Sequence, residues 1–245
     1  MSAKAVRLDK LLANLGYGSR REIQGLARAG AIRLDGAELD DAGARIALEP
    51  DLPARLTIDG EALDPLPGLC LMLHKPRGVT CSHKEAGPLV YGLLPERWRR
   101  RDPPLSTVGR LDKETSGLLL LTDDGALLHR IISPKAEVAK RYRVTLDRPL
   151  TGGEAAVFAS GTLLLEGEER PLLPVDLIAE DATHCAVTLT EGRYHQVRRM
   201  FAALGNHVTA LHRDRVGGLD LPADLPAGAY RVMTAEDVAA VFAGG

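Results

Sequence analysis

The chain has 245 residues, of which 45% are hydrophobic and 26% are charged, and its formal net charge is −2. This composition is typical of a globular protein and excludes a disordered or fibrous chain. No apolar stretch approaches the length needed to cross a bilayer, and the first residues lack the apolar segment of a signal peptide. We therefore expect a cytoplasmic protein.

Three cysteines, Cys70, Cys81 and Cys185, are too few for a disulfide framework and fit a reducing compartment. Cys70 and Cys81 lie near His74 and His83 in the sequence, but their spacing matches no closed zinc-site pattern. Core or edge positions explain these residues better, so we expect no metal site.

The cations are unevenly distributed along the chain. Segments 1–33, 97–113 and 129–148 hold seven, six and six Lys or Arg residues, against two acidic residues each. Clustered cations within a near-neutral total can form a phosphate-binding track, although each cluster alone is more simply a solvated face. Taken together, however, the three clusters favour a nucleic-acid partner, because they flank the candidate catalytic segment around Asp112.

The first predicted elements are two helices. Leucines at positions 8, 11, 12 and 15 recur at helical spacing, which predicts an amphipathic helix that ends at Gly16. Ser19 followed by Glu22 has the spacing of a capping box and predicts the start of a second helix. Arg20 and Arg21 would lie in its first turn, where free N–H groups also favour an anion.

A short hairpin should follow, because Ile32 and Leu34 alternate with polar residues before the turn pair Asp35-Gly36. These elements make up a compact domain over residues 1–62.

A proline-punctuated linker at 63–69 precedes a larger domain over 70–245. This larger region mixes strand-like and helical segments and is predicted to be α+β. Its sequence holds no phosphate-binding glycine loop, so nucleotide hydrolysis and dinucleotide cofactors are unsupported. The predicted strands are 69–74, 117–122, 140–146, 172–178 and 184–190, and the predicted helices are 125–132, 152–159, 194–204 and 235–242.

The most unusual segment is 109–125, GRLDKETSGLLLLTDDG. Asp112 is predicted to lie in a polar loop before a buried strand, where Arg110 and Lys113 would keep its carboxylate ionised. An ionised carboxylate is a competent nucleophile toward a sugar carbon or an electron-poor ring carbon. From the local sequence alone, Asp112 is more simply interpreted as a loop cap or as the partner in a surface ion pair.

A second segment, 140–146, alternates with the period of a strand and places Tyr142 and Val144 on one face, with Arg141 and Arg143 on the other. A tyrosine beside cations could stack on an extruded base, an interaction of about 1–3 kcal/mol. A core tyrosine is the simpler interpretation of this segment alone.

A third segment, 191–201, has the sequence EGRYHQVRRMF. Its apolar residues form a helical stripe, which leaves His195, Arg198 and Arg199 on other faces. Arg198 near the helix start could bind and orient a carboxylate through two hydrogen bonds, with a surface salt bridge as the simpler alternative.

In order and spacing, segments 109–125, 140–144 and 191–200 resemble the motifs of RNA pseudouridine synthases of the RsuA class. Residues 7–36 resemble the S4 RNA-binding domain, which is expected at the N-terminus in that class. The resemblance implies a small S4 domain and a catalytic domain built on a mixed, mainly antiparallel sheet with flanking helices.

The resemblance also implies an activity, the isomerisation of uridine to pseudouridine in RNA without a metal or organic cofactor. Asp112 would be the nucleophile, Tyr142 would stack on the flipped uracil and help remove its C5 proton, and Arg198 would pair with Asp112. Flipping the base costs a few kcal/mol. Attack on the sugar C1′ and abstraction of a sugar proton both remain open as the role of Asp112.

Segments 191–208 and 211–218 resemble the small-subunit (16S) enzymes of the class most. We expect 16S ribosomal RNA as the partner, free or in an assembling small-subunit particle, and neither a membrane nor a small-molecule cofactor. The alternatives are a synthase of the same class that acts on 23S rRNA and a non-catalytic S4-type protein that assists ribosome assembly. Further RNA contacts are predicted at Arg7, Lys10, Arg20, Arg21, Arg110, Lys113, Lys140, Arg193, His195 and Arg199.

Overall fold

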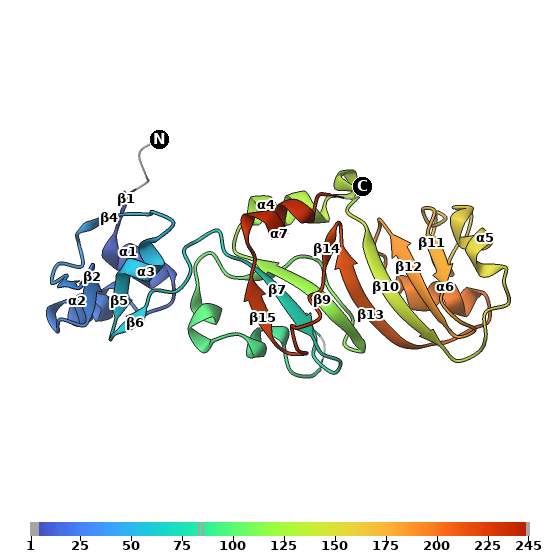
Figure 1. The fold of residues 1–245 in the computed structure, drawn as a ribbon, viewed down its shortest axis with the longest axis horizontal. Helices are drawn as coiled ribbons and strands as arrows, with labels where there is room; N and C mark the ends of the chain where they lie inside the picture. The colour runs from blue at the N-terminus through green and yellow to red at the C-terminus, as the bar shows by residue number, and fades with distance from the viewer. Residues whose placement is uncertain (1–4, 83, 85, 244–245) are drawn as a thin grey trace. The chain divides into compact units, whose positions relative to one another are not determined.

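The computed structural model describes residues 5–82, 84 and 86–243, and these fall into two compact units (Figure 1). Both units combine helices with strands, so the predicted α+β class is confirmed. Among the described residues, no helix is both long and apolar enough to cross a bilayer. The first unit comprises Met1–Leu69, Leu94–Ser106 and Thr122–Asp124, and the second comprises Cys70–Leu93, Thr107–Leu121 and Gly125–Gly245.

The first unit begins with the two predicted helices, α1 (Leu8–Asn14) and α2 (Arg20–Arg28). All four leucines of the predicted stripe are buried, because that face of α1 packs into the core of this unit. The capping box is present, since Ser19 and Glu22 each accept a hydrogen bond from the backbone N–H of the other. Both helix predictions are therefore confirmed.

The strands of the first unit are short. β2 and β3 are joined through Asp35 and Gly36, which both have positive φ angles of 53° and 81°, as a two-residue hairpin turn requires. The sheet order is β3-β2-β5-β6, and β1 pairs separately with β4. The elements are β1 (Ala5–Arg7), β2 (Ile32–Leu34), β3 (Ala37–Glu38), β4 (Arg45–Ala47), α3 (Leu52–Arg55), β5 (Leu56–Ile58) and β6 (Glu61–Ala62).

The segment Leu94–Ser106, with the 3-10 helix η2 (Glu96–Arg100), belongs to the first unit, although its sequence position lies in the predicted catalytic domain. Arg97 donates to both carboxylate oxygens of Asp64 at 2.7 and 3.0 Å, and the backbone N–H of Asp102 donates to the carbonyl of Asn14. Such pairings between distant residues leave no mark in the local sequence. The limits 1–62 and 70–245 stay a prediction.

The second unit is built on one mixed sheet with the order β11-β12-β10-β13-β9-β7-β15 (Figure 1). Strands β13 and β9 pair in parallel, whereas the β10–β12, β10–β13, β11–β12 and β7–β15 pairs are antiparallel, which confirms a mixed, mainly antiparallel sheet. Its strands are β7 (Cys70–Lys75), β8 (Ser106–Thr107), β9 (Thr115–Thr122), β10 (Lys140–Leu146), β11 (Asp176–Ala179), β12 (His184–Leu189), β13 (Val208–Val216), β14 (Leu219–Asp220) and β15 (Tyr230–Val232).

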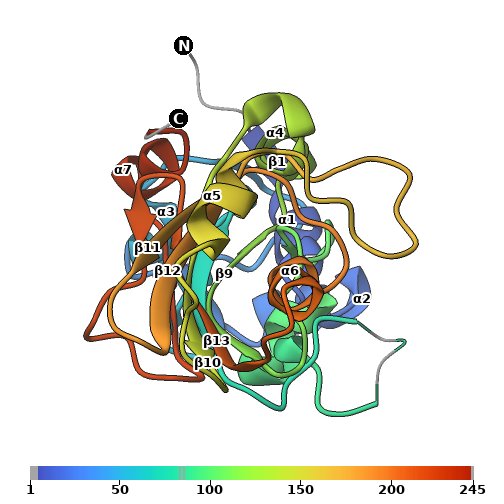
Figure 2. The same ribbon diagram turned by 90° about the vertical axis from the view of Figure 1, so that its right-hand side faces the viewer.

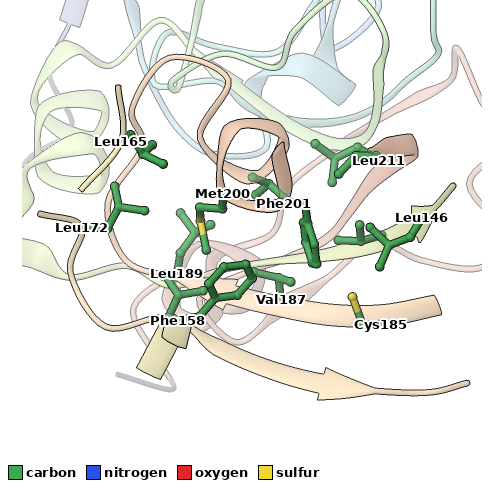
Figure 3. Packing of buried hydrophobic residues seen from close by; sticks show 14 residues of the cluster. Leu146, Phe158, Leu165, Leu172, Cys185, Val187, Leu189, Met200, Phe201 and Leu211 are labelled. Atoms are coloured by element: carbon green, nitrogen blue, oxygen red, sulfur yellow. The ribbon is translucent and has the colours of Figure 1, made fainter. Parts of the chain in front are cut away.

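Helix α6 covers one face of this sheet (Figure 2), because its apolar stripe packs on β10, β12 and β13. Phe158 and Phe201 meet edge to face at 5.2 Å between ring centroids, next to Met200 and Val187 (Figure 3). The helices of the unit are α4 (Gly125–Ile132), α5 (Glu154–Ala159), α6 (Gln196–Ala203) and α7 (Ala235–Ala240), with 3-10 turns η1 (Val90–Leu93) and η3 (Pro134–Ala136).

Two strand predictions need correction. The predicted strand 172–178 is wrong over its first half, since β11 begins only at Asp176 and the preceding residues form a loop. The central strand β13 was not predicted, because four charged or histidine residues, 212–215, interrupt its apolar pattern. In the fold Arg213 is buried in that strand. Burying a charged side chain is costly unless it has hydrogen-bond partners.

Candidate active site

Asp112 lies in the loop that leads into β9, and its side chain is 35% exposed. Its Oδ1 atom lies 3.5 Å from Nε2 of His195, the residue that precedes α6. A pocket of about 310 Å³ opens beside the carboxylate, with Tyr142 and Leu211 among its walls. Residues from all three predicted motif segments line this pocket, so the fold brings the segments together as the sequence analysis expects.

Lys75, at the end of β7, is hydrogen-bonded to the backbone of the Asp112 loop. Its ammonium is fully buried and donates hydrogen bonds to the carbonyls of Asp112, Lys113 and Thr115 at 3.1, 3.3 and 2.8 Å. Burying an ammonium is tolerable only with such acceptors, and the bonds fix the loop backbone in return. Sequence reasoning missed Lys75; the one signal was a lysine followed by Pro76 at the end of an apolar strand.

Tyr142 lies in β10 between Val187 of β12 and Arg213 of β13. Nη1 of Arg213 approaches the tyrosine hydroxyl at 3.5 Å, and Nε of Arg213 donates to the carbonyl of Leu118 at 2.8 Å. Gly117 makes this packing possible, because a Cβ at its φ of 114° would collide with the Arg213 backbone. Arg213, to which the sequence analysis gave no role, therefore braces the tyrosine.

The ion pair that the sequence predicts between Arg198 and Asp112 is not present among the described residues. Arg198 lies in the first turn of α6 and donates to the carbonyls of Val208 and Glu114 at 2.8 and 3.2 Å. Within the described residues, the basic side chain near the Asp112 carboxylate is that of His195 instead. Arg198 thus reaches the backbone of the Asp112 loop and not the carboxylate.

His195 owes its position to an unusual backbone conformation. Its φ and ψ of 50° and 32° are left-handed, a conformation that costs a residue with a Cβ about 1–2 kcal/mol. The buried Gln196 supports the turn, because its side chain accepts from the N–H of Arg193 and donates to Glu191. The arrangement turns the imidazole toward the Asp112 carboxylate.

Arg193 and Arg199 bind protein groups, although both are predicted RNA contacts. Both guanidiniums pair with Glu168, at 3.2 and 2.8 Å, and lower the pKa of that carboxyl, Arg199 most strongly through its hydrogen bond. Arg193 also donates to the carbonyl of Pro171, and Arg199 to that of Glu166. Their main contribution in this structure is to fasten the 166–171 loop beside the turn before α6.

Lys140 lines a second pocket of about 330 Å³, which shares Tyr142 and Arg110 with the first. Its ammonium donates to the carbonyl of Thr190 at 3.1 Å. Burial, and secondarily the charge of Arg213, lowers the pKa of Lys140 to about 8. Arg110 is exposed at the mouth shared by both pockets.

Among the other predicted RNA contacts, Lys113 donates to the carbonyl of Ala86 at 3.0 Å, and Arg7 is paired with Asp9 through two hydrogen bonds. Lys10, Arg20 and Arg21 are exposed, and both arginines lie in the first turn of α2. These last three cations keep the exposure that phosphate binding needs.

The cysteines and histidines weighed for zinc are dispersed in the described part of the chain. All three cysteines are buried, and Nδ1 of His74 is hydrogen-bonded to the carbonyl of Leu225. His83 lies outside the described residues. The described residues include no group of three or more potential metal ligands.

Comparison with known proteins identifies the family to which this fold and site belong. The profile of the RNA pseudouridylate synthase family matches residues 70–203, and that of the S4 domain matches residues 6–49. The chain therefore belongs to the RNA pseudouridylate synthase family and carries an N-terminal S4 domain.

Relatives match over nearly the whole chain. The ribosomal small subunit pseudouridine synthase A of Escherichia coli (strain K12) is 41% identical over 96% of this chain and 100% of its own length. An uncharacterized RNA pseudouridine synthase of Bacillus subtilis (strain 168) is 37% identical over 95% of this chain and 97% of its own. A crystal structure of a pseudouridylate synthase, 36% identical, superimposes with a TM-score of 0.67 and covers 96% of this chain and 99% of that one. The prediction of an RNA pseudouridine synthase with an S4 domain is confirmed.

Proposed function

We propose that the chain converts a uridine of small-subunit (16S) ribosomal RNA to pseudouridine, with Asp112 as the nucleophile. The proposal depends mainly on one observation, the half-buried Asp112 carboxylate that faces a nucleotide-sized pocket beside Tyr142. The choice of 16S RNA follows the name of the Escherichia coli relative that is 41% identical. Free RNA and an assembling small-subunit particle are both candidate forms of the substrate, and the reaction would take place in the cytoplasm.

The target uridine must leave the RNA stack to reach this pocket, because its C1′ and C5 atoms are inaccessible in a helix. Arg110, which is exposed and lines this pocket, would bind a phosphate of the target nucleotide. Arg20 and Arg21, exposed on α2 in the first unit, would bind phosphates elsewhere on the RNA. Tyr142 forms a wall of the pocket against which the uracil ring can stack.

The reaction breaks the N1–C1′ bond, turns the uracil and forms a C5–C1′ bond. The C5 proton is lost and N1 regains one, so atoms and electrons balance without a co-reactant. Asp112 either attacks C1′ or removes a sugar proton; both roles need an ionised carboxylate within reach of the ribose. When protonated, His195 at 3.5 Å would stabilise that negative charge.

Arg198 acts in this proposal as a positioning residue. Its hydrogen bond to the carbonyl of Glu114 and the bonds of Lys75 to Asp112 and Thr115 hold both sides of the catalytic loop. Fixing the nucleophile before the substrate arrives lowers the entropic part of the barrier.

The test is tritium release from RNA that carries 5-tritiated uridine, measured separately on 16S and 23S transcripts. Release from 16S alone supports the proposal. Release from 23S alone favours the large-subunit alternative, and release from neither, with free RNA and with assembling particles, favours a non-catalytic RNA-binding protein.

A further inference from the structure

Tyr194 is a large aromatic residue left exposed beside the catalytic carboxylate. It is 71% exposed and lines the same pocket as Asp112. Its ring stacks on the imidazole of His195, with 3.9 Å between the centroids and 15° between the planes. Because His195 covers one face of the ring while most of the residue is exposed, the other face is open to solvent.

The backbone under this ring is held firmly. The side chain of Gln196 caps the N–H of Arg193, and Nη1 of Arg199 donates to the carbonyl of Tyr194 at 3.2 Å. The backbone of His195 is left-handed, and its ring lies nearly parallel to that of Tyr194. A single exposed aromatic residue usually has no functional meaning. Tyr194 differs, because it lies next to a strained residue in a hydrogen-bonded turn and lines a pocket.

We infer that the open face of Tyr194 binds the base of the nucleotide that adjoins the flipped uridine in the RNA. The inference rests on the proposed function, since it needs a polynucleotide whose target base enters the Asp112 pocket. When that base enters, its neighbour loses a stacking partner and is held by the backbone at the pocket mouth, where Tyr194 lies. An aromatic face replaces the lost partner without regard to base identity.

The surroundings fit a nucleic acid better than a protein partner. Arg110 is exposed and lines the same pocket, where it would bind the phosphate between the two nucleotides. His195 supports the ring from behind, so a base on the open face would extend a stack of three rings. This arrangement makes Tyr194 a substrate-binding residue and leaves the chemistry to Asp112.

The experiment compares Tyr194→Ala, Tyr194→Leu, Tyr194→Phe and the wild type on the RNA that the wild type modifies. Loss of one stacked base should raise KM by about 5- to 150-fold in the Ala and Leu variants, with kcat changed little. Tyr194→Phe keeps the ring and should behave as the wild type. Ile178→Ala, at an exposed residue of β11, is the control for loss of an exposed apolar side chain.

A second readout follows stacking itself. With 2-aminopurine in place of the base on either side of the target, binding should quench its fluorescence at one position for the wild type and Tyr194→Phe, and not for Tyr194→Ala. A wild-type KM in Tyr194→Ala or in Tyr194→Leu, or undiminished quenching in Tyr194→Ala, overturns the inference.

Failure of the proposed function has a different signature from failure of this inference. A wild type that releases no tritium from any ribosomal RNA refutes the proposed function, and with it the inference. An active wild type whose KM is insensitive to Tyr194→Ala refutes the inference alone.

Discussion

Two aspartates of the segment 109–125, one before β9 and one after it, have opposite environments. The side chain of Asp123 is 1% exposed, binds Arg101 at 2.9 Å, and also accepts from the N–H of Gly68 at 2.8 Å. Asp112 is 35% exposed, and among the described residues the basic side chain near its carboxylate is His195, with Nε2 at 3.5 Å. The oxygens of Asp123 are occupied by the protein, whereas those of Asp112 remain available to a substrate.

The comparison shows that residue type and local sequence do not distinguish a structural carboxylate from a reactive one. The two carboxylates differ in the number of hydrogen-bond donors that the folded protein places around each of them. A buried pair such as Arg101–Asp123 satisfies both charges and leaves no reactivity. A half-exposed carboxylate on a rigid loop keeps an oxygen free at a fixed place.

The largest expected effect is the loss of activity in Asp112→Asn. Removing the nucleophile should lower kcat by about 10⁴-fold or more, while stability and RNA affinity stay near the wild type because few protein contacts are lost. Tritium release, urea unfolding and RNA binding measured on the same preparation check this. Substantial turnover by the variant would remove Asp112 from the reaction.

Asp123→Asn should give the opposite result. Breaking a buried ion pair leaves the Arg101 charge uncompensated, so the free energy of unfolding should fall by about 3–5 kcal/mol. Urea unfolding measures this, with Asp112→Asn as the matched control. Equal stability of the two variants would contradict the distinction drawn between the two aspartates.

Lys75→Met tests whether the loop before β9 needs its support. The substitution keeps the length and apolar stem of the side chain but leaves at least three loop carbonyls without the ammonium. A loosened nucleophile should lower kcat by about 10²-fold. Single-turnover rates at saturating RNA measure the loss, and an unchanged rate in a folded variant argues that the loop positions Asp112 without Lys75.

The same contrast applies to the cations Arg101 and Lys140, and the smallest expected effect is a change of RNA affinity with the protonation of Lys140. Unlike Arg101, it has no carboxylate partner in the described chain, and its pKa is lowered to about 8, chiefly by burial. The unfolded chain therefore binds more protons between about pH 8 and 10.5, so stability should rise with pH across that window. RNA phosphate favours the charged amine, so RNA affinity should fall a few-fold as pH rises through 8.

Lys140→Arg keeps its charge throughout this range and should flatten the pH dependence of RNA affinity. Dissociation constants measured from pH 7 to 9.5 at constant salt provide the check. Equal slopes for the variant and the wild type would place the titrating group elsewhere.

Local signals in the sequence predicted the parts of the fold that local interactions determine. The stripe of α1, the capping box of Ser19 and the bounds of β10 depend on residues only a few positions apart, and the structure contains all three. The resemblance of three segments to the motifs of one family likewise implied that Asp112 and Tyr142 act on the same nucleotide, and both residues line one pocket.

The remainder depends on contacts between distant residues. Lys75 and Arg213 bind backbone carbonyls up to 95 positions away, and a carbonyl acceptor has no sequence signature. The family resemblance implied that Arg198 pairs with the Asp112 side chain, and an arginine can bind a carboxylate through two hydrogen bonds, yet its guanidinium binds two main-chain oxygens. The main-chain acceptors of Arg198 therefore could not be read from the sequence.

The most direct test of the role of Asp112 is a structure of the Asp112→Asn variant bound to its RNA. We expect the target uridine outside the RNA stack, with its C1′ about 3–3.5 Å from the substituted side chain and its uracil against Tyr142. A target uridine that stays stacked in the RNA, or that binds away from this pocket, would show that Asp112 does not react with it.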